Sequence, residues 1–221
     1  MKKLSVITVV ALFIIGCHFG GLGAGVKGSG VRKTEQRTLN PFSSITTEGA
    51  FEIVVVCQKP QTFEISGDDN LVPLVSTDVS GGVLHIKNTQ NYSAHEPMTI
   101  KISVPDIAFL RTDGAGTMEV SALKNDNLKI KSNGAPTIRV AGETKLLEIS
   151  ANGAGKIDAH KLRATSATVE ANGVPGIEVF ASDALNVNVS GPARVLYHGD
   201  PKVTKTINGP GSVEKKKSEG S

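Results

Sequence analysis

Apolar and polar residues alternate in short runs along most of the chain, and in its second half these runs repeat at a nearly constant spacing. Six glycine motifs mark the repeat, and their first glycines are 20, 19, 20, 18 and 18 residues apart. They are Asp113-Gly114-Ala115-Gly116, Asn133-Gly134-Ala135-Pro136, Asn152-Gly153-Ala154-Gly155, Asn172-Gly173-Val174-Pro175, Ser190-Gly191-Pro192-Ala193 and Asn208-Gly209-Pro210-Gly211. Four residues after each glycine stand Met118, Ile138, Ile157, Ile177, Val195 and Val213. Four residues before stand Leu110, Ile130, Ile149, Val169 and Val187, with Lys205 as the exception. This fixed phase predicts a structural repeat.

Each repeat predicts an alternating strand, a corner at the glycine and a second alternating strand. Asn-Gly suits a corner because glycine has no Cβ and asparagine tolerates positive φ. The same dipeptide between strands also fits an antiparallel hairpin. Against hairpins, the corners are extended by further residues, and Pro136 and Pro175 would remove ladder donors from a strand. We therefore predict an all-β fold, a β-solenoid with coils of 18–20 residues that stack on one another.

Residues 37–107 carry a looser version of the pattern. Residues 45–53 have the strand-glycine-strand form, and residues 99–104 alternate again. We expect this region to form the first coils or a capping layer, with its longest connections at 67–70 and 88–98.

The N-terminal residues resemble a bacterial lipoprotein signal. Lys2 and Lys3 precede an almost wholly apolar run that ends at Ile15, which is too short to span a bilayer as a helix. Gly16 and Cys17 follow, as in the lipobox, where a small residue precedes the cysteine that receives lipid. An ordinary secretory signal with a chance cysteine is the alternative. His18 in place of aspartate is compatible with sorting to the outer membrane.

The predicted organisation has four parts. A signal peptide over 1–16 precedes a lipidated cysteine and glycine-rich tether over 17–36. The solenoid domain follows over 37–214, and 215–221 form a polar tail.

Net charge limits the classes of partner that we expect, and the cysteine content limits the role of Cys57. The formal net charge is +3, and Lys2 and Lys3 contribute to it, so nucleic acid is not an expected partner. Membrane attachment is expected from lipid, for which two or more acyl chains give stable anchoring. Cys57 is the only other cysteine and shares strand parity with Phe51 and Ile53, so we interpret it as a buried apolar residue.

The sequence also resembles a known family. Pro41-Phe42-Ser43-Ser44-Ile45, Gly67-Asp68-Asp69-Asn70-Leu71 and Tyr197-His198-Gly199-Asp200-Pro201 are similar to motifs of the head GIN domain of putative auto-transporter adhesins. The resemblance covers about residues 31–215. It implies a right-handed parallel β-helix of the kind common in lipoproteins and exported proteins of Bacteroidetes-like bacteria, and it supplies no catalytic residues.

Some β-helices act on polysaccharides, and their catalytic sites need clustered carboxylates. Asp158 and Glu178 each follow a corner glycine by five residues, with Glu119 in the same phase, so these carboxylates are expected on stacked coils. Arg139 occupies that phase between Glu119 and Asp158, which favours an exposed charge ladder. A carbohydrate-active enzyme is the alternative reading.

Neither metal nor cofactor sites are predicted. The four histidines of the predicted domain lie far apart in the sequence and form no closely spaced pair of metal ligands: His85, His95, His160 and His198. Residues 153–158 are faintly similar to calcium-binding nonapeptide repeats, but the period differs. Tyr92 and His95 suggest a small contact site, although a solvated loop is the simpler interpretation.

The sequence thus predicts a non-enzymatic, lipid-anchored module of the cell envelope, held to the outer membrane through Cys17. It would bind a protein or a glycan in the manner of an adhesin. A structural envelope protein without a discrete ligand is a further alternative.

Overall fold

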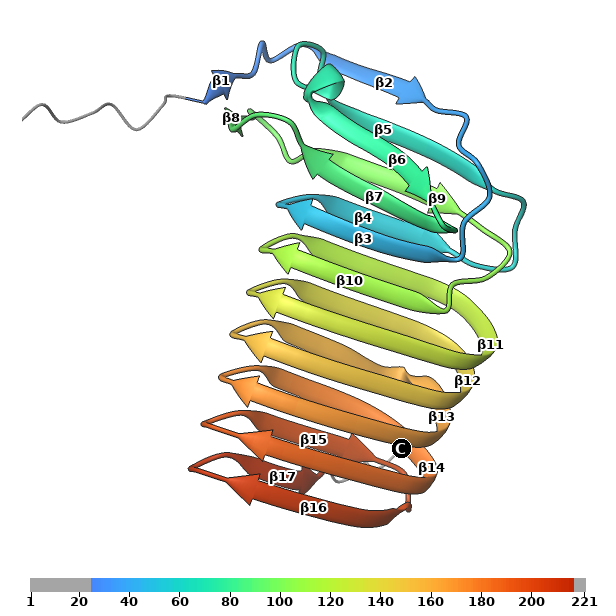
Figure 1. Ribbon diagram of the computed structural model, residues 1–221, viewed down its shortest axis with the longest axis vertical. Helices are drawn as coiled ribbons and strands as arrows, with labels where there is room; N and C mark the ends of the chain where they lie inside the picture. The colour runs from blue at the N-terminus through green and yellow to red at the C-terminus, as the bar shows by residue number, and fades with distance from the viewer. Residues whose placement is uncertain (1–24, 217–221) are drawn as a thin grey trace, which may run out of the picture.

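The computed structural model describes residues 25–216, which form a stack of β-coils with one strand of each coil in each of two sheets (Figure 1). The regular coils are built from β10 (Phe109–Gly114), β11 (Thr117–Gly134), β12 (Thr137–Gly153), β13 (Lys156–Gly173), β14 (Gly176–Ser190), β15 (Arg194–His198), β16 (Lys202–Asn208) and β17 (Ser212–Lys215). All neighbouring strands within these coils pair in parallel. The predicted all-β solenoid with coils of about 20 residues is confirmed.

The four long strands β11 to β14 each bend and serve both sheets. In β11, the segment 117–121 pairs with β4 (Glu52–Val56), whereas the segment 129–134 pairs with β10. We call sheet 1 the strands that run into the corner glycines, and sheet 2 the strands that follow them. Sheet 1 comprises 44–49, 109–114, 127–134, 146–153, 166–173, 184–190 and 202–208, and sheet 2 comprises 52–56, 117–121, 137–140, 156–159, 176–180, 194–198 and 212–215.

The core lies between the two sheets, where alternate side chains of every strand point inward. All eleven apolar residues that stand four positions before or after a corner glycine are buried. Lys205 is the one exception in the sequence pattern, and it lies on β16 in the last coil. Its Nζ donates to the carbonyl oxygen of Val213 at 3.4 Å, so the charged side chain covers the open end of the core.

The corner glycines occupy a conformation that few other residues adopt. Gly134 has φ +98°, and a Cβ built there would lie 2.6 Å from the carbonyl oxygen of Gly114 on the preceding coil. Positive φ and the close stacking of successive corners therefore both require glycine. The asparagines before these glycines form a ladder, because Asn152 donates its side-chain amide to Asn133 at 3.0 Å and Asn172 donates to Asn152 at 2.9 Å.

The N-terminal strands form the first coil and cover its outer end. They are β1 (Val26–Lys27), β2 (Arg32–Gln36), β3 (Ser44–Gly49), β4, β5 (Thr62–Asp68), β6 (Val75–Ser80), β7 (Val83–Asn88), β8 (Tyr92–Ser93) and β9 (Thr99–Ser103), with the short 3₁₀ helix η1 (Val72–Leu74). Strand β3 pairs with β10 and β4 pairs with β11, both in parallel. Strand β5 runs antiparallel between β2 and β9, and β6 runs antiparallel to β7. This is the capping layer that the looser pattern predicted.

The segment between Gly25 and Gln36 belongs to this cap, which differs from the flexible tether predicted over 17–36. Strand β1 pairs with β8, and β2 pairs with β5. The buried carboxylate of Asp68 accepts hydrogen bonds from the backbone amides of Gly30 at 3.0 Å and His95 at 3.1 Å. Glycines here allow close backbone contact rather than flexibility. The predicted signal peptide and Cys17 lie outside the described residues.

No helix within residues 25–216 has the length and apolar content needed to cross a membrane. Cys57 is buried with 1% of its surface exposed, which confirms its interpretation as a core residue.

Candidate functional site

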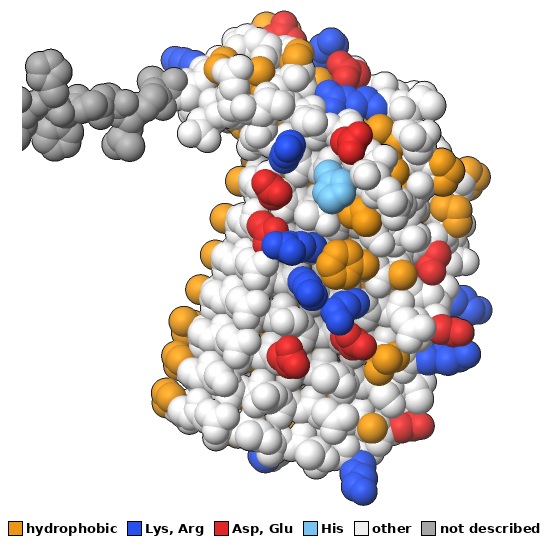
Figure 2. All heavy atoms as spheres, viewed as in Figure 1, with side chains coloured by type: hydrophobic (Ala, Val, Ile, Leu, Met, Phe, Trp, Pro, Cys, Tyr) orange, Lys and Arg blue, Asp and Glu red, His pale blue; other side chains and the backbone are white. Residues whose placement is uncertain are grey.

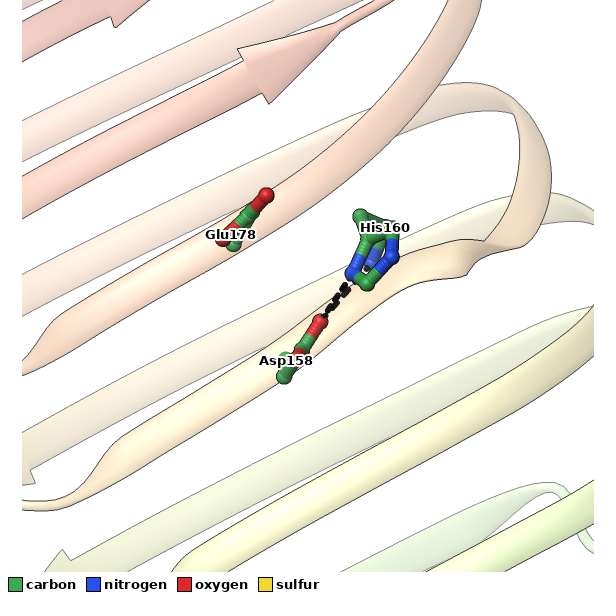
Figure 3. Close-up of side chains that lie close together, drawn as sticks. All are labelled: Asp158, His160 and Glu178. Carbon is green, nitrogen blue, oxygen red and sulfur yellow. Dashed lines mark hydrogen bonds and ion pairs between the residues drawn. The ribbon is translucent and has the colours of Figure 1, made fainter. Parts of the chain in front are cut away.

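A cluster of ionisable side chains lies on the outer face of sheet 2, where four successive coils bring it together. We call it the Asp158 cluster: Asp158, His160, Glu178, His198 and Lys216. Asp158 and His160 belong to β13 and Glu178 to β14 (Figure 3). His198 belongs to β15. Asp158 and Glu178 are register partners on neighbouring strands, as their shared phase predicted.

Strand alternation and an irregularity in β13 together place His160 beside Asp158. The flanking Ile157 and Ala159 are buried, so Asp158 points outward. The register of β13 with β14 then shifts between Ala159 and Arg163. His160 and Lys161 both face outward before Leu162 returns to the core. Such a bulge redirects side chains and is common beside functional sites.

The ligating atoms of Asp158, His160 and Glu178 all lie within 4.8 Å of one another. Nδ1 of His160 contacts Oδ1 of Asp158 (Figure 3). Glu178 has two further partners, because its Oε1 lies 2.7 Å from Nε2 of His198 and accepts a hydrogen bond from Nζ of Lys216 at 2.9 Å. The rings of His160 and His198 stand 5.4 Å apart between centroids. Side chains from four coils thus meet at one point.

The carboxyl group of Glu178 remains ionised in this setting. Burial raises its pKa, but hydrogen bonds from Lys216 and His198 and the positive charges of Lys216 and His160 outweigh burial and bring the pKa to about 2. The Glu178 side chain is 15% exposed, compared with 32% for His160. The cluster therefore holds a fixed, partly buried anion between two imidazole rings.

A surface groove of about 320 Å³ adjoins the cluster on sheet 2. Asp158 and His160 line one end of it, and the remaining lining residues are Val54, Glu119, Val120, Ser121, Arg139, Val140, Ala141 and Lys161. Arg139 pairs in register with both Glu119 and Asp158, and its guanidinium contacts the Glu119 carboxylate at 2.8 Å. The predicted alignment of charges is present, and Glu119 and Arg139 form an exposed ion pair. Asp158 and Glu178 differ from the predicted exposed ladder, because both are largely buried and their partners are His160, His198 and Lys216.

The structure corrects the expectation that the histidines lie apart. His160 and His198 each stand seven residues after a corner glycine, Gly153 and Gly191, so the repeat placed them in one phase. That shared phase was the signal that sequence reasoning missed. His85 instead lies on β7, and His95 lies beside Asp68 at the cap. Tyr92 is partly buried against the core, so Tyr92 and His95 do not form one solvated loop.

Sheet 1 presents a different outer face, which is the one seen in Figure 2. Charged side chains gather over the upper coils, whereas the part over β14 and β16 is largely uncharged. The outward side chains there carry amides and hydroxyls: Asn186, Asn188, Ser190, Thr204, Thr206 and Asn208. They pair in register as Asn186 with Thr204, Asn188 with Thr206, and Ser190 with Asn208. We call these six residues the amide-hydroxyl face.

A row of apolar side chains follows the corners along the left edge of the same view. One exposed residue per coil makes up the row: Ala50, Ala115, Ala135, Ala154, Val174, Pro192 and Pro210. Val174 is the largest of them and is 58% exposed.

Comparisons with known proteins agree on the fold. A family model described as putative auto-transporter adhesin, head GIN domain, matches residues 41–201. No curated protein matches the chain. A putative adhesin from Bacteroides fragilis is 21% identical with a TM-score of 0.68, and the match covers 86% of this chain and 100% of that one. A putative adhesin from Parabacteroides merdae is 21% identical with a TM-score of 0.58, covering 87% and 99%. A putative lipid binding protein from Parabacteroides distasonis is 22% identical with a TM-score of 0.55, covering 87% and 99%. At these identities the solved structures are evidence for the fold alone.

Proposed function

Since the chain belongs to the head GIN domain family of putative auto-transporter adhesins, we propose that it is a lipid-anchored, non-enzymatic binding module of the cell envelope. The family description is consistent with an envelope or surface location. Cys17 is the residue that we propose to carry the lipid, in the outer membrane. The ligand that we propose is a glycan, which the amide-hydroxyl face binds.

The amide-hydroxyl face is the observation that carries this proposal. Its side chains lie in register on adjacent strands, with a spacing of about 4.8 Å between strands. Amides and hydroxyls both donate and accept hydrogen bonds, which suits the hydroxyl groups of a sugar. The face is uncharged, so it favours neutral hydrogen-bonding ligands over nucleic acid or acidic partners. A rigid two-sheet scaffold also lowers the entropic cost of binding, because the face is formed before the ligand arrives.

An enzymatic role is the competing reading, and the carboxylates Asp158 and Glu178 motivate it. Hydrolysis of a glycoside needs one carboxyl group that holds a proton near neutral pH. The low pKa of Glu178 leaves it ionised there, and its partners His198 and Lys216 keep it so. Glu178 therefore does not serve as the proton donor of such a reaction. A screen for release of reducing sugars from envelope and dietary glycans tests the point, and an activity lost on Asp158→Asn would overturn the non-enzymatic proposal.

Glycan binding is tested with an array of bacterial and host glycans probed by the purified chain. We expect Asn188→Arg combined with Thr206→Arg to abolish the binding seen with the unchanged protein. Thr165→Arg, which changes an exposed residue at the bend of β13, is the matched control and should bind normally. Glycan binding that survives the double substitution would contradict the proposal. So would an array on which no glycan is bound, if cross-linking on intact cells recovers a protein partner instead.

Lipid anchoring is tested separately by metabolic labelling with a clickable fatty acid and by cell fractionation. We expect the unchanged chain to incorporate label and to fractionate with the outer membrane. Cys17→Ser should lose the label and leave the membrane fraction. Equal labelling of both proteins would refute the anchor at this cysteine.

A further inference from the structure

We propose that Asp158, His160 and Glu178 form a binding site for a divalent transition-metal ion, with zinc as the ion of best fit. The three side chains bring two carboxylates and one imidazole to a single point on sheet 2 (Figure 3). This site is independent of the proposed glycan face, which lies on the opposite sheet.

The separation of the ligating atoms suits a small ion. Zinc binds nitrogen and oxygen at about 2.0–2.2 Å, so ligand atoms in a tetrahedral shell stand about 3.4 Å apart. The three ligating atoms here already lie within 4.8 Å of one another. Rotation of these surface side chains would adjust their ligating atoms to the spacing that the ion requires.

The donor set selects the kind of metal. Calcium and magnesium prefer shells made of oxygen, which an imidazole ring does not supply. Imidazole with carboxylates is the donor set of zinc and related first-row ions. The two carboxylates also supply the negative charge that a divalent cation requires.

The surrounding residues hold the ligands in place. Asp158 and Glu178 sit on paired strands of two coils, and the bulge after Ala159 fixes the outward course of His160. His198 is a positioning residue, because its Nε2 lies 2.7 Å from the Glu178 carboxylate and orients it. Lys216 also contacts this carboxylate, with 45% of its side chain exposed, so the ion competes with it for one oxygen. Asp158 and His160 open onto the groove of sheet 2, from which water completes the shell.

Isothermal titration of the purified chain with zinc chloride tests the site, using protein that carries no polyhistidine tag. We expect one equivalent of zinc to bind, and calcium chloride to give no binding. His160→Ala and Glu178→Gln should each weaken zinc binding about tenfold or more. His85→Ala is the matched control, because His85 is an exposed histidine on β7 and outside the cluster, and it should leave the affinity unchanged.

Cobalt substitution gives a second readout that does not depend on heats of binding. A tetrahedral cobalt site absorbs strongly in the visible region, and this band should be absent in His160→Ala. Circular dichroism shows whether each variant is folded. No zinc binding by the unchanged chain, or equal affinities for His160→Ala and His85→Ala, would overturn the proposal. Glycan-array results for folded His160→Ala separate the two proposals, since this variant should retain glycan binding.

Discussion

Asn152 donates its side-chain amide to the amide oxygen of Asn133, its register partner on the preceding coil, at 3.0 Å. Asn172 repeats the contact on Asn152 at 2.9 Å, and Asn133 donates to the carboxylate of Asp113 at 2.5 Å. Four successive corners are therefore joined by side chains in addition to their backbones. A chain of this kind favours one register, because a slip of a single residue would break every link.

Asn152→Ala should destabilise the protein, since it removes one donated and one accepted hydrogen bond. We expect the free energy of unfolding to fall by about 1–2 kcal/mol, as two partly exposed neutral hydrogen bonds predict. Urea unfolding followed by circular dichroism measures the change. Asn186→Ala lies on the same sheet but outside the ladder and should have a smaller effect. Equal losses for both variants would show that the ladder contributes nothing specific.

Gly134→Ala should be among the most damaging single substitutions. Its φ of +98° disfavours alanine, and the new Cβ would meet the Gly114 carbonyl oxygen at 2.6 Å. We expect a loss of about 3 kcal/mol or more from strain and clash together. Gly176→Ala is the matched control, because no atom lies within 4 Å of a Cβ built there. Thermal melts of the two variants should differ clearly, and similar melting temperatures would contradict the stacking argument.

Asp113 should make stability depend on acid pH. Burial raises the pKa of this carboxyl, but hydrogen bonds from Asn133 and Arg111 and the charge of Arg111 outweigh it and hold the pKa below its ordinary value. A carboxyl group whose pKa is lowered by folding stabilises the protein at pH values above its unfolded-state pKa. This stabilisation disappears as the pH falls through the folded-state pKa. Asp113→Asn should therefore be less stable than the unchanged protein near neutrality. The difference should shrink between about pH 5 and pH 2 in urea titrations. A constant difference across that range would exclude this role for the carboxylate.

Cys57 should resist alkylation while the protein is folded. Burial, with a smaller contribution from the negative charge of Asp106, raises the pKa of its thiol to about 11. Little thiolate forms at neutral pH, and the side chain is 1% exposed. Iodoacetamide labelling followed by peptide mapping should show modification of Cys57 only in denaturant. Labelling of the native protein at the rate of a free cysteine peptide would disprove its burial.

The regular coils were predictable because each repeat places its apolar residues at the same offsets from its corner glycine. Leu110 and Met118 flank Gly114 at the same offsets as Ile130 and Ile138 flank Gly134, so one alignment of the repeats fixes strands, corners and inward positions together. The burial of Cys57 followed from the same alternation. Pairing of Asp158 with Glu178 followed from their common phase.

Other features depend on contacts that no local pattern contains. The segment from Gly25 to Gln36 has a tether-like composition, but it is held by β8, β5 and the buried carboxylate of Asp68, all distant in the sequence. The spacing from the corner glycines places His160 and His198 on one face but two coils apart, and it does not reveal the register shift after Ala159 that accompanies their close approach. Long-range pairing and bulges are the parts of this fold that sequence reasoning leaves undetermined.

The backbone of each regular coil pairs only with the coils before and after it, so the domain can change length by whole units. Deleting or duplicating one segment of about 20 residues would remove or add one layer and leave the remaining layers as they are. Each unit would alter the span of the stack by about 5 Å. For the anchored protein proposed above, gene duplication would adjust in steps how far the domain extends from the membrane, with the capping strands and the terminal strands β16 and β17 unchanged.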